Sequence, residues 1–147
     1  NGSTWTEVNN MNTARGKMCG SGIQTSAIGS GGTPGPAALV ETWDGTSWTE
    51  VAELNTSRSA GAAGGKANSS ALAFGGGPSR TANTELWNGS AWTEVANLST
   101  ATQDMNYGSV GSTGGTLAIG GDPSPSPVST RTEEWTADNA VLTVTTS

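Results

Sequence analysis

The hydrophobic and polar residues of this chain are arranged in short segments, and four such segments follow one another in the middle of the sequence. Residues 60–65 are all small, residues 71–75 are mostly apolar, and residues 84–87 and 91–95 alternate. Short segments that are small, continuously apolar or alternating in this way predict β-strands rather than helices. We therefore predict four short strands in this stretch, and no helix longer than one turn anywhere in the chain.

The same order of segments returns at a regular spacing. The motif NGSTWTEV at residues 1–8 returns as DGTSWTEV at 44–51 and as NGSAWTEV at 88–95, at spacings of 43 and 44 residues. A second tryptophan series, which an insert at 122–127 lengthens at its last step, consists of Trp43, Trp87 and Trp135. Repeats of this length indicate a solenoid, an array or a propeller.

The content of one repeat favours the propeller. Asn88-Gly89 and Asp44-Gly45 separate the last two strands of their units, which predicts hairpins with type I′ turns. Residues 60–64 are only Ala and Gly, as the crowded innermost strand of a propeller blade requires. We predict an all-β fold of three four-stranded propeller blades, at residues 9–52, 53–96 and 97–147.

The predicted blades do not make a closed ring. Propellers have about 4 to 8 blades, and residues 3–8 add only the outer strand of a blade preceding the first. We expect the chain to be the C-terminal part of a longer propeller. The alternative is a ring of several copies joined head to tail, in which residues 3–8 and 141–145 compete for one blade edge.

The repeat resembles the kelch family. Its marks are an apolar strand ending in Gly75-Gly76, an acidic residue and an aromatic at Glu85 and Trp87, and a later Trp92. The first aromatic is Trp where kelch repeats usually have Tyr, and Ala140 stands where the third unit should have its closing Trp. The resemblance implies a propeller, in which Arg15 and Arg58 hydrogen-bond neighbouring carbonyl groups.

A narrower resemblance concerns the style of the sequence. The chain is rich in Thr, Ser, Asn and Gly, and its ending at residues 133–147 resembles kelch-like proteins of tailed, especially marine, bacteriophages. This resemblance implies a virion or extracellular location. It also implies other virion proteins, upstream blades or further copies of the chain as partners, and possible contact with a host-surface glycan.

Composition and charge exclude several classes of function. Six Lys and Arg face 12 Asp and Glu, a net charge of −6, so we expect no nucleic-acid partner. Without His, and with Cys19 as the only Cys, the chain cannot build a histidine-based hydrolase, a histidine-rich metal site or an intrachain disulfide. No apolar run approaches the roughly 18 residues of a membrane span. We expect no metal, no cofactor and no membrane insertion.

The recurring side chains have a structural and a functional interpretation. Trp5, Trp48 and Trp92 suit a sugar-stacking platform, but their fixed spacing favours packing within blades. Paired carboxylates suit glycoside hydrolysis, but equivalent positions on successive blades favour bonds to backbone or Arg instead. Cys19 is expected to be a small buried thiol. The carboxylates in question are Glu41, Glu85 and Glu133.

Binding residues are expected on the least periodic segments, since a repeat scaffold varies its loops. These segments follow the Gly pairs at residues 31–32, 75–76 and 120–121, and they cover residues 33–37, 77–83 and 122–128. We name the surface they form the loop face, with Arg80, Asp122 and Arg131 as its candidate polar contacts.

From these features we expect a binding or structural module in a phage virion appendage rather than an enzyme. The alternatives are a carbohydrate-active enzyme on a propeller scaffold and a scaffold that only links proteins.

Overall fold

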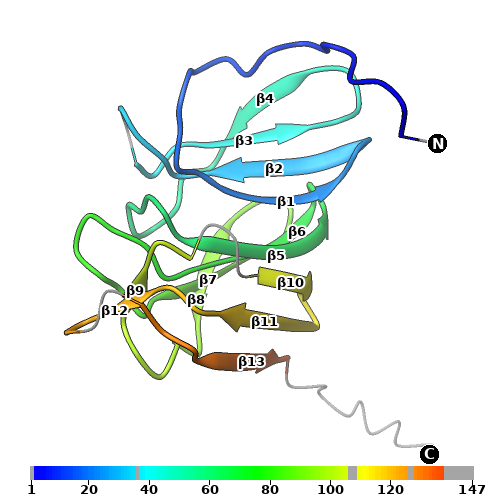
Figure 1. Ribbon diagram of the computed structural model, residues 1–147. Coiled ribbons are helices and arrows are strands. Elements are labelled where there is room, and N and C mark those ends of the chain that lie inside the picture. The colour runs from blue at the N-terminus through cyan, green and yellow to red at the C-terminus, as the bar shows by residue number, and fades with distance from the viewer. Residues whose placement is uncertain (1, 36, 106–108, 126–127, 138–147) are drawn as a thin grey trace, which may run out of the picture.

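The computed structural model describes residues 2–35, 37–105, 109–125 and 128–137, and within them the chain is all-β without a helix (Figure 1). None of the described segments offers a helix that could cross a bilayer. The first sheet is an antiparallel meander in chain order, formed by β1 (Cys19–Ile23), β2 (Ser26–Ser30), β3 (Val40–Trp43) and β4 (Trp48–Val51).

The second and third sheets repeat this meander. The second consists of β5 (Ala62–Ala67), β6 (Ser70–Phe74), β7 (Thr84–Trp87) and β8 (Trp92–Val95). The third consists, in its described part, of β10 (Ser109–Ser112), β11 (Gly115–Ile119) and β13 (Thr132–Thr136). A two-stranded ribbon pairs β9 (Thr102–Gln103) with β12 (Asp122–Pro123).

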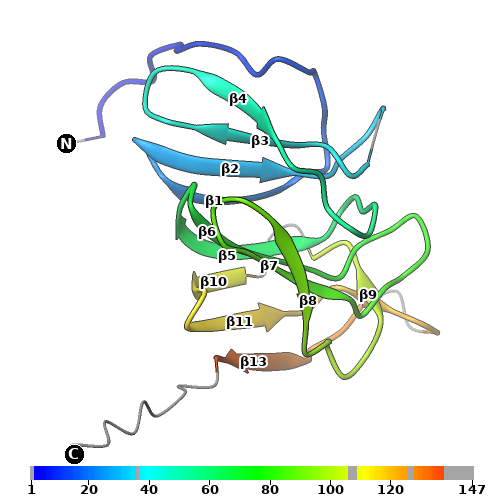
Figure 2. The same ribbon diagram turned by 180° about the vertical axis from the view of Figure 1, so that it is seen from behind.

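The three sheets are stacked with their first strands side by side, as Figures 1 and 2 show from opposite directions. β5 contacts both β1 and β10. Small residues are needed here, since a Cβ atom added to Gly61 would lie 2.9 Å from both the Cys19 Sγ and the Phe74 carbonyl oxygen. This is the arrangement of neighbouring propeller blades. The prediction of an all-β, propeller-like fold is therefore confirmed, while the sheets of the described residues do not close into a ring.

Two apolar cores separate the sheets, and the alternation of side chains along β6 divides its residues between them. Ala71 and Ala73 join Trp87 and Trp92 in the core between the first and second sheets. Leu72 and Phe74 face the other way, into the core between the second and third sheets. The middle sheet is thus covered on both faces. This explains why four consecutive residues of β6 are buried.

The hairpin loops differ from the predicted type I′ turns. Trp87 pairs with Trp92, so four residues form the loop, and of the Asn88-Gly89 pair only Gly89 has a positive φ, at 95°. The Asn88 side chain explains the difference, because its Oδ1 accepts hydrogen bonds from the backbone N–H groups of Ser90 and Ala91. Such side-chain bonds stabilise a longer turn.

The prediction that residues 3–8 are the outer strand of a preceding blade stays a prediction, and within this chain alone residues 2–10 form no strand. The physical reason is that no described strand lies beside them as a hydrogen-bonding partner. The N-terminal segment instead runs along the first sheet, above β4 in both views (Figures 1 and 2). The fourth strand predicted for the third blade falls on residues 138–147, outside the described residues.

The Gly pairs end β2, β6 and β11 at points where backbone approaches backbone. Gly76 has a φ of 109°, and a Cβ atom there would lie 2.8 Å from the Ser59 carbonyl oxygen. Its N–H donates to the Thr102 carbonyl at 2.8 Å, and the N–H of Gly32 donates to the Arg58 carbonyl at 2.9 Å. Each of these two pairs thus joins its own sheet to the connection that begins the next one.

Candidate functional site

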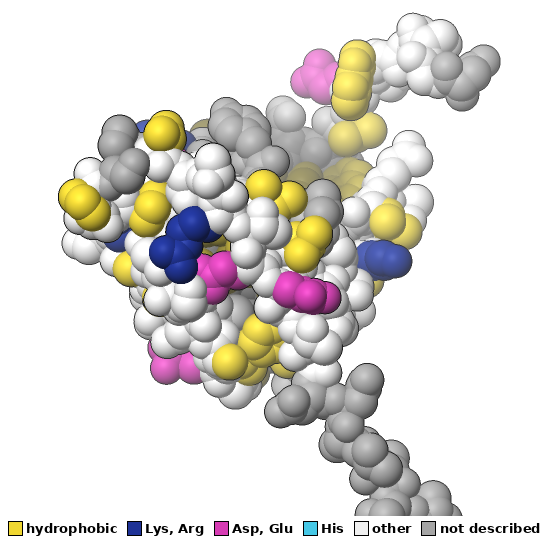
Figure 3. Space-filling view, turned by 60° about the horizontal axis from the view of Figure 1, so that its bottom comes forward, with side chains coloured by type: hydrophobic (Ala, Val, Ile, Leu, Met, Phe, Trp, Pro, Cys, Tyr) yellow, Lys and Arg dark blue, Asp and Glu magenta, His cyan; other side chains and the backbone are white. Residues whose placement is uncertain are grey.

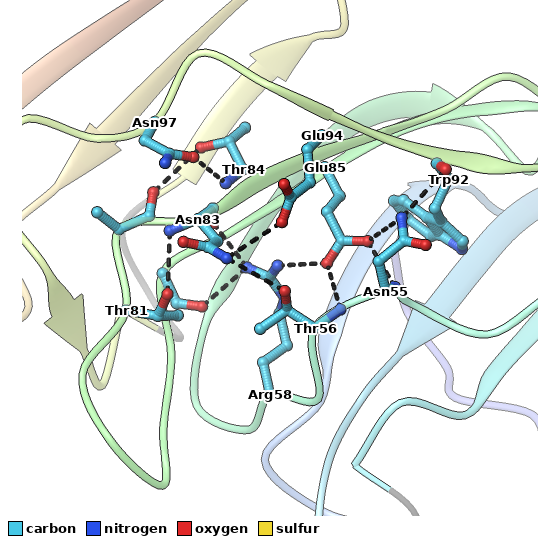
Figure 4. A network of polar contacts seen from close by, with 12 residues as sticks. Asn55, Thr56, Arg58, Thr81, Asn83, Thr84, Glu85, Trp92, Glu94 and Asn97 are labelled. Atoms are coloured by element: carbon cyan, nitrogen blue, oxygen red, sulfur yellow. Dashed lines mark hydrogen bonds and ion pairs between the residues drawn. The ribbon is translucent and has the colours of Figure 1, made fainter.

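Glu85, in the middle of β7, is the centre of a buried polar network (Figure 4). Its carboxylate accepts four hydrogen bonds from the connection between β4 and β5. Asn55 donates its backbone N–H at 2.7 Å and its side-chain amide at 3.0 Å, while Thr56 donates its N–H at 3.0 Å. The fourth donor is the Arg58 guanidinium, whose Nη2 lies 2.6 Å from Oε1.

The guanidinium of Arg58 has two further partners, both backbone carbonyls. Its Nη1 donates to Gly75 at 3.0 Å and to Asn83 at 2.8 Å. The side chains of Arg58 and Glu85 are both completely buried. A buried ion pair of this kind needs such additional hydrogen bonds to offset the loss of hydration. The network ties the connection between β4 and β5 to β7, the third strand of the sheet that follows it.

The first sheet has the same network around Glu41 of β3. Arg15 binds this carboxylate at 3.0 Å, and both side chains are fully buried. The Nη1 of Arg15 donates to the carbonyls of Gly31 and Leu39, each at 2.7 Å. The predicted bonds from Arg15 and Arg58 to neighbouring carbonyls are therefore confirmed, as is the structural interpretation of Glu41 and Glu85.

Glu133 of β13 departs from this pattern. Its carboxylate accepts the Ser99 N–H at 2.7 Å, but the Arg131 guanidinium is 4.0 Å away and the carboxylate side chain is 26% exposed. Thr102 stands where the earlier units have their buried Arg. The third network is therefore an open and weaker form of the other two.

The tryptophans of the hairpins form pairs across their strands. Trp87 and Trp92 have ring centroids 5.3 Å apart, and Trp43 and Trp48 are 5.5 Å apart. Trp92 is 7% exposed, and its indole N–H donates to the Ala52 carbonyl at 3.1 Å. The packing role is confirmed for Trp92, and Trp48 is half-buried.

Trp5 does not follow the packing prediction. Its side chain is fully exposed, at 104% of the reference area. The reason is the one that leaves residues 3–8 without a strand, because no described strand pairs with this segment.

The loops that follow β2, β6 and β11 leave one edge of the stack, on the left in Figure 1. An ion pair joins two of them, since the Arg80 guanidinium binds both carboxylate oxygens of Asp122, at 3.0 and 2.8 Å. Gln103 donates to the same carboxylate at 3.2 Å. The hydrogen bond from Arg80, with a smaller contribution from Gln103, holds the pKa of Asp122 below its usual value.

The structure thus brings together two of the three candidate residues of the loop face. Arg131 is bonded elsewhere, with its guanidinium donating to the Ser99 hydroxyl at 3.0 Å. Sequence reasoning selected Arg80 and Asp122 singly and missed their pairing, because 42 residues separate them. On the side shown in Figure 3 one basic side chain lies against an acidic one, and further charged side chains are scattered singly over a mainly uncharged surface.

Cys19 lies at the start of β1 and is 2% exposed. Burial raises the pKa of its thiol to about 11. The thiolate is the reactive form of Cys, and a raised pKa keeps the thiol protonated near neutral pH. Cys19 is therefore a small buried packing residue, as predicted.

A groove between the second and third sheets is a feature that the sequence analysis did not identify. Its apolar lining includes the buried Leu72 and Phe74 together with Ala96, Leu98 and Trp135. The available signal was the absence of the closing Trp from the third unit. Among the described residues, no three Asp, Glu, Cys or His side chains gather as metal ligands.

Comparison with known proteins supports the fold alone. No protein family matches this chain, and no curated protein matches it by sequence. Among solved structures, one titled "Structure of YjhT" superimposes with a TM-score of 0.68 at 18% sequence identity. The match covers 84% of this chain and 43% of that one, so the chain spans less than half of its structural neighbour. YjhT has a β-propeller fold, and this chain is similar to part of it.

Proposed function

We propose that this chain is a binding and structural module rather than an enzyme. In this proposal it belongs to an appendage of a tailed-phage virion and meets a host-surface glycan or another virion protein through its loop face. The placement in an extracellular virion rests on the resemblance of the sequence to phage kelch-like proteins. The choice of surface rests on the geometry of the loops.

The observation that carries the proposal is the ion pair between Arg80 and Asp122. It links loops of two neighbouring sheets whose lengths and sequences vary while the framework repeats. The Nη2 of Arg80 donates to both carboxylate oxygens of Asp122 and its Nε donates to the Asp122 backbone carbonyl at 3.0 Å, and these charge-assisted bonds fix the relative position of the two loops. A rigid scaffold that holds variable loops in a defined arrangement is suited to recognition.

The framework residues support a non-catalytic role. Glu41 and Glu85 are buried, and their oxygens accept hydrogen bonds from the connections beside them. A general acid or a nucleophile needs a carboxylate that reaches substrate. These two carboxylates are engaged in holding the sheets together.

Glycan-array binding and mapping within an intact virion test the proposal together. We expect the protein to bind a glycan, and Arg80→Gln to lose that binding. The matched control is Lys66→Gln. It removes an exposed positive charge near the C-terminal end of β5, outside the loop face, and should leave binding intact. A position in the virion without glycan binding supports the scaffold role. Turnover of a glycan, or neither binding nor a virion position, would overturn the proposal.

A further inference from the structure

The outer edge of β13 has no strand beside it among the described residues. In the first two sheets β4 and β8 occupy this place, paired with β3 and β7. The sequence of β13 begins TEEW where β7 has TELW. An unpaired edge of this kind presents free backbone N–H and carbonyl groups to another strand. β13 therefore has the form of a strand whose partner comes from elsewhere.

The residues that line the groove beside this edge are equivalent to those that hold an indole ring in the second sheet. In the second sheet Trp92 packs against Trp87 and donates its indole N–H to the Ala52 carbonyl. In the third sheet Trp135 takes the place of Trp87, and Ala96 follows β8 as Ala52 follows β4. Both residues line the groove. The stacking surface and the equivalent carbonyl are present without the second indole.

Residues 1–8 carry the sequence that fits this place. They match residues 88–95, which include β8, at every position except Thr4, where the later motif has Ala91. In the structure Trp5 is fully exposed and Val8 is 65% exposed. The chain thus contains both a strand motif whose two large apolar side chains are exposed and, beside β13, a strand position that no described residue fills.

The connectivity of the sheets shows why one copy does not satisfy itself. An outer strand leads directly into the first strand of the next sheet, as β4 leads into β5. Trp5 precedes Cys19 of β1 by the same 14 positions that separate Trp48 from Ala62 of β5. Residues 3–8 therefore fit a sheet preceding β1, whereas β13 lies at the opposite end of the stack (Figures 1 and 2).

We propose that the edge of β13 binds residues 3–8 of a second copy of this chain. The register follows β7 and β8, with Trp5 opposite Trp135, Thr6 opposite Glu134, Glu7 opposite Glu133 and Val8 opposite Thr132. Trp5 fills the groove, and its indole N–H donates to the Ala96 carbonyl.

Strand addition of this kind combines main-chain hydrogen bonds with a side-chain pocket. It also places the first sheet of one copy against the outward face of the third sheet of the other. Ile119, which is 40% exposed, lies in the third sheet and would gain cover there. Two copies joined in this way at both ends have twice three sheets, within the range of about 4 to 8 blades of closed propellers.

Site-directed cross-linking tests the register. Thr6→Cys protein is mixed with ¹⁵N-labelled Glu134→Cys protein and treated with a short bis-maleimide, and mass spectrometry identifies the mixed product. Both positions are exposed, and opposite residues in adjacent strands have Cβ atoms about 4.5–5.5 Å apart. We expect an efficient mixed product, with the buried Cys19 unmodified.

The matched control replaces Thr6→Cys by Thr49→Cys. Thr49 has the same place in its motif and is exposed, but its strand is already paired with β3. A Thr6→Cys product no more abundant than this control overturns the proposal. The proposal also fails if Glu134→Cys links instead to a cysteine introduced at Val141, because the chain's own tail then occupies the edge.

The strength of self-association gives a second test, which does not depend on the geometry of cross-linking. Trp5→Ala should weaken self-association in sedimentation equilibrium by more than roughly tenfold, the scale of an aromatic anchor at an interface centre. Thr6→Ala, which changes an exposed side chain on the same strand, should alter it by less than about threefold. Equal association of Trp5→Ala and the unchanged protein would overturn the proposal.

Discussion

Replacing Glu85 by Gln is expected to destabilise the fold severely, and Glu133→Gln provides a matched comparison. Glu85→Gln removes the carboxylate that is bonded to the buried Arg58 guanidinium. Losing one partner of a buried pair costs about 3–5 kcal/mol, because the remaining charge is left uncompensated. The carboxylate at Glu133 is 26% exposed and 4.0 Å from its Arg. Its replacement should therefore cost less than about 1 kcal/mol.

Urea unfolding followed by far-UV circular dichroism measures both variants. A loss of about 3–5 kcal/mol is a large part of the roughly 5–15 kcal/mol that stabilises a typical domain, so Glu85→Gln should unfold at a much lower urea concentration. All samples need one protein concentration, since self-association shifts apparent stability. The double variant Arg58→Met/Glu85→Gln should recover part of the loss, because no buried charge remains. Equal midpoints for Glu85→Gln and Glu133→Gln would refute the structural role of the network.

Three further predictions concern packing, charge and the thiol. Trp92→Ala should lower the unfolding free energy by about 3–5 kcal/mol, whereas Trp5→Ala in dilute monomer should stay within about 0.5 kcal/mol; a stable Trp92→Ala protein in urea unfolding would argue against packing. The Arg80 contact keeps the pKa of Asp122 low, so its stabilising effect exists above the ordinary value of about 3.9 and is lost as pH falls through the lowered value. Carboxyl NMR titration should show the Asp122 pKa rising in Arg80→Gln, and an unchanged titration would contradict the pairing. Cys19, with a pKa of about 11, should react with a disulfide reagent at neutral pH only after unfolding, and rapid labelling of the folded protein would show that the thiol is accessible.

The sequence predicts the strands well because their signals are local. The predicted strands at residues 84–87 and 91–95 correspond to β7 and β8, since alternation, hairpin residues and Gly pairs lie within a few positions of each other. The role of Glu85 was accessible because the repeat places Glu at this position in all three units, and the role of Arg58 was implied by the resemblance to kelch repeats. Periodicity thus carries information about framework residues and about the stacking of the sheets.

Features without a repeat or a local partner were not predictable in this way. The pairing of Arg80 with Asp122 depends on how two variable loops approach in space. The hairpin loops have four residues because the side chains of Asp44 and Asn88 bond to backbone N–H groups, which residue preferences for positive φ do not reveal. Residues 3–8 have the sequence of a strand, but a strand forms only beside a partner.

Sedimentation velocity of the 147-residue chain tests most directly the claim that it is a stack of propeller-like sheets with open ends. An open sheet edge and an uncovered apolar face favour association with another chain. At micromolar concentration the account predicts a species of at least two copies, with circular dichroism showing β-structure. A well-folded monomer of 14.7 kDa under the same conditions would contradict it, because the chain would then cover its own edge and faces.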